Sequence, residues 1–218
     1  MERLLKGIQH FQQHVHPRNR ALFQRLAQGQ NPEALVIGCS DSRLSLDLIT
    51  QSGPGDIFAC RNAGNIVPPH DRTDAVSATV EYALRVLKIK HIIVCGHSDC
   101  GAMKALLNPA SVAELPNVAK WLRHAQGARH ALEELAPGAG QKEAVDAVTR
   151  LNVRLQIEHL RTHPHVFAQL QAGNLKLHGW VFDIPSGIVI AWDADNLRWA
   201  PIQEIEAIPE PELISAVA

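Results

Sequence analysis

The sequence predicts an α/β fold, in which one mainly parallel β-sheet is flanked by helices, with N-terminal helices and an added hairpin at an edge of the sheet. Three short apolar runs, at 34–38, 56–60 and 91–96, lack polar alternation, as expected of parallel strands covered on both faces. Helical periodicity over 75–87 separates the second run from the third. Strands that alternate with helices favour a parallel sheet.

The N-terminal 30 residues predict two helices. The apolar face of the first comprises Leu4, Leu5, Ile8, Phe11 and Val15. We expect Pro17 to end this helix, because proline disrupts a helix interior. A second, shorter helix over 21–26 precedes a loop at 28–32, which leads into the first strand.

The second half of the chain predicts helices followed by a hairpin. Residues 114–160 are mostly helical in pattern, with an interruption at 137–140. The runs 175–183 and 187–192, joined around Pro185, predict a hairpin that extends the sheet at an edge. The tail, which contains Pro201, Pro209 and Pro211, is weakly specified. Because no repeat or linker divides the chain, we predict a single catalytic domain over 1–218.

Composition narrows the classes of function. A chain of 218 residues with 46% hydrophobic content can bury one sizeable core. Its 21 Lys+Arg and 22 Asp+Glu residues nearly balance, and no basic stripe predicts nucleic-acid binding. We find no export signal and no apolar run that could span a membrane, so we expect a cytoplasmic protein with no membrane partner. Its four cysteines are then better suited to metal binding, reaction or core packing than to disulfides.

Polar side chains follow each of the three predicted strands. Cys39 follows the first, Arg61 and Asn62 the second, and His97 and Cys100 the third. The carboxyl ends of parallel strands meet at one edge of the sheet, where sites are built. Residues far apart in the sequence can therefore be neighbours there.

Cys39, His97 and Cys100 form a candidate metal set. Two thiolates and one imidazole are ligands that zinc prefers, and three protein ligands leave a tetrahedral position open, which is typical of a catalytic site. The alternative is that all three residues fill the core at strand ends. Their combined placement favours the metal. Cys60 and Cys95 lie within apolar runs, so we assign both to the core.

Asp41 and Arg43 stand two positions apart, directly after Cys39. In an extended segment their side chains point the same way, which allows a carboxylate–guanidinium pair beside the metal. The alternatives are a surface ion pair or a turn stabilised by Asp41. We favour the functional interpretation, in which Asp41 either orients a metal-bound nucleophile or itself becomes a fourth ligand when Arg43 releases it.

Two motifs, Cys39-Ser40-Asp41-Ser42-Arg43 and His97-x-x-Cys100-Gly101, resemble those of the β-class carbonic anhydrases. The similarity extends through 55–58, 61–65, 81–83 and 177–180, and so covers about residues 1–195. It implies a Zn²⁺ enzyme that reversibly hydrates CO2 to bicarbonate and a proton. In the mechanism that the resemblance implies, zinc-bound hydroxide attacks CO2 and is oriented by the Asp41–Arg43 dyad. It also implies a homo-oligomer, a dimer or a multiple of dimers such as a tetramer, in which helices at 1–30 pack on a partner subunit.

The resemblance further implies a substrate pocket. Its residues, some of them supplied by the neighbouring subunit, are Gln30, Phe58, Ala63, Tyr82 and Gly101. Other interpretations stay open for three of them: Gln30 lies in a loop sequence typical of turns, and Phe58 and Tyr82 suit a core or an interface equally well.

Val36 stands where a subset of the family has a tryptophan that supports a bicarbonate-triggered inactive form. The missing indole favours a site that is open at all times. The N-terminal half also resembles the carboxysomal enzymes of cyanobacteria. This chain lacks their long C-terminal extension, so a carboxysome location is the secondary expectation.

Two other functions compete with CO2 hydration. Relatives on this fold hydrolyse carbon disulfide or carbonyl sulfide, and the same zinc chemistry could act on those linear molecules. The chain could also be a zinc-bearing structural adaptor without turnover. The presence of both Asp41 and Arg43 argues against an adaptor, because a purely structural zinc needs no such pair.

Overall fold

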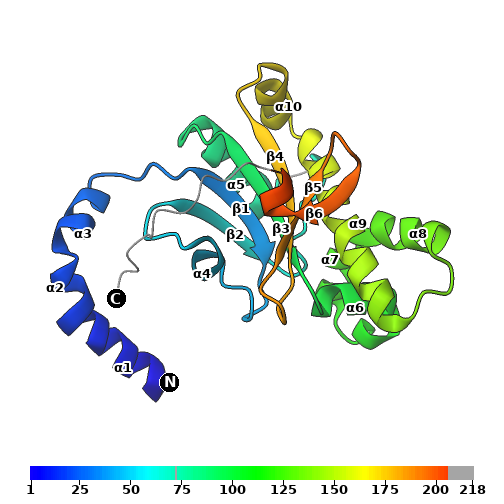
Figure 1. The fold of residues 1–218 in the computed structure, drawn as a ribbon, viewed down its shortest axis with the longest axis horizontal. Coiled ribbons are helices and arrows are strands. Elements are labelled where there is room, and N and C mark those ends of the chain that lie inside the picture. The colour runs from blue at the N-terminus through cyan, green and yellow to red at the C-terminus, as the bar shows by residue number, and fades with distance from the viewer. Residues whose placement is uncertain (72, 206–218) are drawn as a thin grey trace.

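The computed structural model describes residues 1–71 and 73–205, and within them it contains one six-stranded sheet (Figure 1). The strand order is β2-β1-β3-β4-β5-β6. The strands are β1 (Ala34–Cys39), β2 (Ile57–Asn62), β3 (His91–His97), β4 (Lys176–Phe182), β5 (Val189–Asp193) and β6 (Arg198–Pro201). The first four pair in parallel, whereas β5 and β6 are antiparallel to their neighbours. The predicted mainly parallel α/β fold is therefore confirmed.

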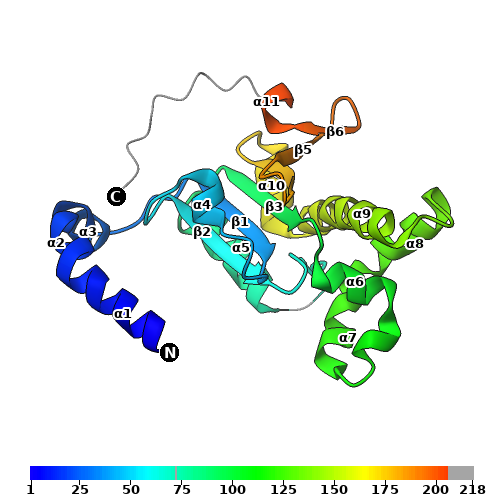
Figure 2. The ribbon, with the colours of Figure 1, turned by 60° about the horizontal axis from the view of Figure 1, so that its bottom comes forward.

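Helices lie on both faces of the sheet (Figures 1 and 2). The α-helices of the described chain are α1 (Glu2–His10), α2 (His16–Arg18), α3 (Arg20–Leu26), α4 (Leu46–Thr50), α5 (Ala75–Arg85), α6 (Gly101–Leu107), α7 (Pro116–Leu122), α8 (Gln126–Leu135), α9 (Gln141–Arg161), α10 (Pro164–Gln171) and α11 (Ile202–Ile205). Val36 and Ile93 pack on one side with α6 and α8, and Leu35 and Ile92 pack on the other with α5 and α10. Burial on both faces explains why these strands are continuously apolar.

The predicted hairpin forms, but not at the edge. β4 and β5 pair through Trp180 and Ala191, while β4 also pairs in parallel with β3 and so lies inside the sheet. The edge strand on this side of the sheet is β6, which was not predicted from the sequence. Its Trp199 packs against Trp192 of β5, with ring centroids 5.7 Å apart. Pro201 ends this strand, and the end of an edge strand tolerates a residue without an N–H.

The prediction that Pro17 ends the first helix is wrong. The chain passes from α1 through a π-helical segment, Phe11–Val15, into α2, and the helical run breaks only at Asn19. We attribute this to the wider π-helical turn before Pro17, which relieves the clash between its ring and the preceding turn. Proline then occupies the first turn of α2, where its missing N–H is harmless.

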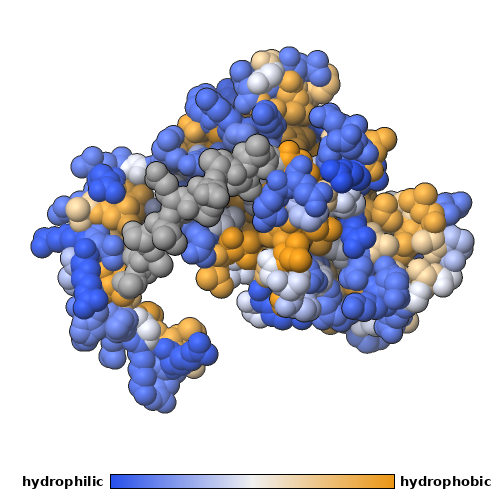
Figure 3. Space-filling model, viewed as in Figure 1, coloured by the Kyte–Doolittle hydropathy of each residue, from blue (hydrophilic) through white to orange (hydrophobic). Residues whose placement is uncertain are grey.

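The N-terminal helices project away from the body of the molecule (Figures 1 and 2). None of their residues is buried, and the exposed fractions of Leu4, Leu5 and Ile8 are 64%, 53% and 54%. Figure 3 shows apolar surface on the side of these helices that is turned toward the body. Such an amphipathic face normally packs against another element.

The structure describes the first residues of the predicted domain but not its last ones. Pro209 and Pro211 lie outside the described residues. In the described part of the chain, no helix is long and apolar enough to cross a membrane.

Candidate metal centre

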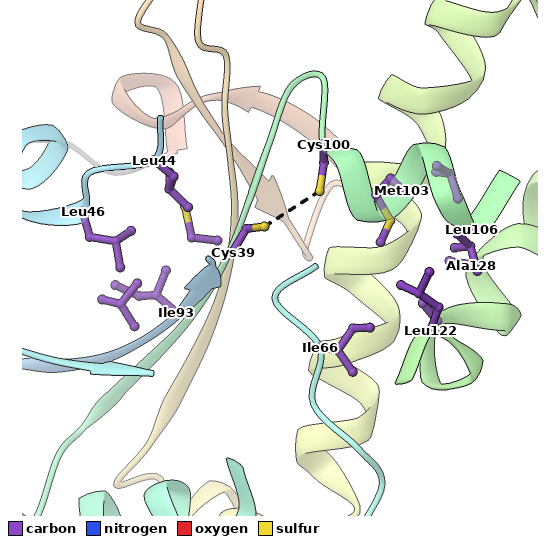
Figure 4. Close-up of a cluster of buried hydrophobic side chains, with 14 of the residues drawn as sticks. Cys39, Leu44, Leu46, Ile66, Ile93, Cys100, Met103, Leu106, Leu122 and Ala128 are labelled. Atoms are coloured by element: carbon purple, nitrogen blue, oxygen red, sulfur yellow. Dashed lines mark hydrogen bonds between the residues drawn. The ribbon is translucent and has the colours of Figure 1, made fainter. Parts of the chain in front are cut away.

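Two chain segments bring three residues together at the carboxyl edge of the sheet. β1 ends at Cys39 and the neighbouring β3 ends at His97. Cys100 follows in the loop from β3 and is the residue before α6. Figure 4 shows the Cys39 side chain at the tip of β1 directed toward that of Cys100. Parallel pairing of adjacent strands thus makes neighbours of residues 58 positions apart, from 39 to 97.

The donor atoms of Cys39, His97 and Cys100 lie within 4.8 Å of one another, and all three residues are buried. The two Sγ atoms are 4.0 Å apart. His97 Nδ1 lies 2.9 Å from the carbonyl oxygen of Ser98, which makes Nδ1 the protonated nitrogen and leaves Nε2 as the free lone pair. Nε2 is buried without a hydrogen-bond partner among the described residues. Since burying an unpaired polar atom is unfavourable, this arrangement fits a metal ion.

The electrostatics of the cysteine pair favour one thiolate before any metal binds. A hydrogen bond from Cys100 lowers the pKa of Cys39 to about 4, although burial acts in the opposite direction. The pKa of Cys100 is raised, because its S–H donates a hydrogen bond to Cys39 and because the residue is buried. Burial lowers the pKa of His97, but the proximity and negative charge of the Cys39 thiolate outweigh burial and raise it.

Asp41 and Arg43 form a bidentate ion pair at the rim of this centre. Arg43 Nε donates to Asp41 Oδ1 at 3.0 Å, and Arg43 Nη2 donates to Oδ2 at 2.8 Å. The backbone N–H of Arg43 also donates to Oδ1. These hydrogen bonds hold the pKa of the Asp41 carboxyl well below its usual range. Asp41 Oδ2 lies 3.8 Å from His97 Nε2, so the carboxylate borders the position that a metal would take.

Asp99 is a partner of Arg43 that the sequence analysis missed. Arg43 Nη1 donates to Asp99 Oδ2 at 3.1 Å, and Lys104 forms an ion pair with the other carboxylate oxygen. Hydrogen bonds from Lys104 and Arg43 lower the pKa of Asp99. Asp99 lies between His97 and Cys100 in the sequence, a position that could have suggested a contact with the dyad.

Arg61 holds the loop that carries the dyad. From the end of β2, its Nε donates to the carbonyl of Cys39 at 3.0 Å, and its Nη2 donates to the carbonyls of Asp41 and Leu44 at 2.7 and 2.8 Å. The sequence predicts Arg61 at this edge of the sheet but indicates no role for it in holding the loop. Its partners are backbone carbonyls, which carry no signature in a sequence.

The predicted pocket residues do not all lie near this centre. Ala63 is next to Gly64, whose N–H donates to Cys39 Sγ at 3.4 Å, and Gly101 directly follows Cys100. Phe58 pairs in register with Leu35, four residues before Cys39, which is roughly 13 Å along the strands.

The other two pocket candidates belong to exposed parts of this chain. Tyr82 packs on Phe58, with ring centroids 5.9 Å apart, and 46% of it is exposed. Gln30 is exposed in the loop after α3. Within one chain, therefore, Gln30, Phe58 and Tyr82 are not gathered around the cysteines.

The assignments of the remaining cysteines to the core are confirmed for Cys95 and only partly for Cys60. Cys95 is 2% exposed, and burial raises its pKa to about 12. Cys60 is half-buried on the edge strand β2, where it packs against the core from one side. Val36, at 1% exposed, fills the core of the sheet face that adjoins α6 and α8.

Comparisons with known proteins agree with this geometry. Residues 34–189 match the family model described as carbonic anhydrase. A carbonic anhydrase of Pseudomonas aeruginosa is 46% identical over 205 residues, which are 94% of this chain and 93% of that protein. A carbonic anhydrase of Synechococcus elongatus is 43% identical over 87% of this chain and 71% of its own length.

Solved structures give the same result. The β-carbonic anhydrase CcaA superposes with a TM-score of 0.90 at 41% identity, over 92% of this chain and 98% of its own. A structure from a report on two tetrameric β-carbonic anhydrases of Sordaria macrospora gives a TM-score of 0.79 at 35% identity, over 87% of this chain and 95% of its own.

Proposed function

Because this chain belongs to the β-class carbonic anhydrases, a family of lyases, we propose that it uses one Zn²⁺ ion to hydrate CO2 reversibly to bicarbonate and a proton. The observation that supports the proposal most is the convergence of Cys39, His97 and Cys100, with the Nε2 lone pair of His97 buried and without a hydrogen-bond partner among the described residues. Two sulfur ligands and one imidazole suit zinc better than they suit magnesium or calcium.

The protein's own groups have definite tasks in this reaction. Bound zinc supplies a nucleophile at neutral pH, because it lowers the pKa of water to about 7. The carboxylate of Asp41 would accept a hydrogen bond from that nucleophile and so orient it toward CO2. Arg43 fixes the carboxylate through two parallel hydrogen bonds, so that Asp41 remains a charged acceptor.

The same ion pair bears on whether Asp41 itself ligates the metal. Both of its oxygens accept hydrogen bonds from Arg43. These bonds stabilise the carboxylate beside the metal position and oppose its binding as a fourth ligand. We infer that this is the active arrangement, and that an inactive form with Asp41 on the metal requires this pair to break. Val36 in place of an indole gives such a form no added support.

We further propose that the active unit is a dimer or a multiple of dimers. Gln30, Phe58 and Tyr82 lie away from the cysteines of their own chain, and the N-terminal helices expose an apolar face. Both features are explained if 1–30 packs on a partner subunit and these residues complete the partner's CO2 pocket, beside Ala63 and Gly101. A cytoplasmic location remains a prediction, with the carboxysome as its alternative.

Stopped-flow CO2 hydration with a pH indicator tests the proposal, with zinc measured on every sample. We expect wild type to be active with about one zinc per chain, and Cys39→Ser to lose zinc and activity. Asp41→Asn should keep zinc but lose at least tenfold in kcat, because the amide can donate to the nucleophile instead of only accepting.

Cys95→Ser is the control, since this buried cysteine is not among the three convergent residues. The proposal fails if wild type holds zinc and does not hydrate CO2 at alkaline pH. Carbon disulfide and carbonyl sulfide would then be the substrates to assay, and inactivity on these as well would point to an adaptor.

A further inference from the structure

One peptide unit connects the cysteine pair to the helical side of the molecule. The N–H of Gly64 donates to Cys39 Sγ at 3.4 Å. The carbonyl of the same peptide unit, Ala63 C=O, accepts a hydrogen bond from Trp121 Nε1 at 2.9 Å. The next carbonyl, Gly64 C=O, accepts one from Asn152 Nδ2 at 3.0 Å. Side chains from α7 and α9 therefore fix the peptide unit that faces the sulfur and the peptide unit that follows it.

The α9 side of this arrangement is fully buried. The exposed fractions of Asn152 and Gln156 are both 0%. Gln156 Nε2 donates to Asn152 Oδ1 at 2.8 Å, and Gln156 Oε1 accepts from the backbone N–H of Val67 at 2.8 Å. These two side chains, one helical turn apart, bond to each other and to the backbone of Gly64 and Val67. A buried network in which each group has a partner restricts the loop to one position.

Gly64 is the residue that permits this geometry. Its φ of +82° lies in the left-handed region that side chains disfavour. A Cβ added there would lie 3.1 Å from Ala102 Cβ and 3.2 Å from Met103 Cε, both in α6. Without a side chain, the backbone can approach α6 closely and turn its N–H toward Cys39.

We propose that Trp121 is a positioning residue for the metal centre, acting through the Ala63–Gly64 peptide to aim and polarise the N–H that donates to Cys39 Sγ. A carbonyl that accepts a hydrogen bond makes the N–H of its own peptide a stronger donor. A donor on a ligating sulfur fixes the ligand and tunes the charge that it places on the metal. Asn152 is the second positioning residue. This inference rests on the proposed function, because it takes Cys39 to be a zinc ligand.

Two replacements of Trp121 separate its N–H from its ring. Trp121→Phe removes both the N–H and part of the ring, whereas benzothienylalanine at position 121 keeps the bicyclic shape and replaces the N–H by sulfur. We measure the zinc Kd by competition with a chromophoric chelator and the thiolate-to-cobalt charge-transfer band of the Co²⁺-substituted protein. Circular dichroism checks that each variant is folded. Trp199→Phe is the matched control on β6, remote in the fold from α7.

Both replacements at 121 should raise the zinc Kd by about tenfold, the size of effect typical of groups that support metal ligands. The charge-transfer band should move to lower energy, because a sulfur without its donor gives up charge more readily. The control should change neither quantity. The inference is overturned if benzothienylalanine at 121 leaves the Kd and the band as in wild type. If instead wild type binds no zinc, or Cys39→Ser binds it equally well, the proposed function fails.

Discussion

Cys39 and Cys95 show how strongly position determines the chemistry of one residue type. Both are buried in the sheet, at 5% and 2% exposure. The pKa of Cys39 is lowered to about 4 because Cys100 donates to its sulfur, whereas burial without a donor raises the pKa of Cys95 to about 12. Since the thiolate is the form that ligates metal, the chain prepares Cys39 for that role and leaves Cys95 inert.

A pH titration of the metal-free protein tests this difference. The thiolate is the charged form, so a lowered pKa means that it is present at pH 7 and is lost as the pH falls through about 4. We expect ultraviolet absorbance to report one thiolate per chain at pH 7. Cys95→Ala should leave this signal intact, and Cys39→Ala should abolish it. A titration only above pH 8 would contradict the assignment.

Arg61 offers a second test at the scale of single residues. Arg61→Gln removes donors to three carbonyls of the dyad loop, so we expect activity to fall at least tenfold and stability to fall by about 2 kcal/mol in urea unfolding. Arg61→Lys should not restore activity, because an ammonium lacks the planar fork. Arg85→Gln, at an exposed position of α5, should behave as wild type. Full activity in Arg61→Lys would show that charge alone is enough.

Residues whose side chains can themselves bind a metal could be predicted from the sequence. Residues that act by donating hydrogen bonds to backbone carbonyls could not. Cys39, His97 and Cys100 could be placed together because parallel strands end at one edge and because their side chains share a preference for zinc. Arg61 and Trp121 contribute through hydrogen bonds to carbonyl groups. Every residue has a carbonyl, so no pattern of residue types predicts which one is used.

Among the secondary-structure elements, α9 determines how closely the helical layer approaches the sheet. Glycines stand where this helix crosses β3 and β4. A Cβ at Gly179 would lie 2.9 Å from Ile157 Cδ1 and from Val153 Cγ1, and one at Gly96 would lie 2.9 Å from Val153 Cγ2. Because α9 also carries Asn152 and Gln156, this close approach brings the loop beside Cys39 within reach of them.

Gly179→Ala tests the close approach. The added methyl group overpacks the helix–sheet contact, so we expect a loss of about 2 kcal/mol in urea unfolding. Combining it with Val153→Ala should cost less than the sum of the two single changes, because the smaller side chain makes room. Gly7→Ala is the control, since nothing lies within 4 Å of a Cβ there. Strict additivity in the double variant would contradict the packing argument.

Element prediction from sequence succeeded where hydrophobic periodicity was strong. The strands β1, β2 and β3 and helix α5 formed within about two residues of their predicted bounds. Two elements were mispredicted because tertiary structure decided them. β6 has only four residues and ends in a proline, and it forms because β5 offers an edge to pair with. The run through Pro17 continues because a π-helical segment precedes it.

At the scale of the whole molecule, the N-terminal helices are the feature that one chain does not explain. Apolar side chains that stay in water contribute no hydrophobic stabilisation, and among the described residues none of α1 is buried. In the described sheet, β2 pairs only with β1 and so leaves an open edge, a second surface that proteins normally cover. Both surfaces fit the proposed oligomer.

Charged substitutions on the apolar face test that assembly. Leu5→Glu with Ile8→Glu should shift the molar mass measured by light scattering toward the monomer and lower the activity, because the proposed pocket is completed across subunits. Gln9→Glu with Gln13→Glu adds the same charge without removing apolar side chains and should leave the oligomer intact. A wild-type protein that is monomeric and fully active would contradict the shared pocket.

The central claim is that Cys39, His97 and Cys100 hold one zinc ion with a position free for solvent. X-ray absorption at the zinc edge of the purified protein tests it most directly. We predict two sulfur neighbours at about 2.3 Å and two nitrogen or oxygen neighbours at about 2.0–2.1 Å. A protein without zinc, or a zinc ion with fewer than two sulfur neighbours, would contradict the claim.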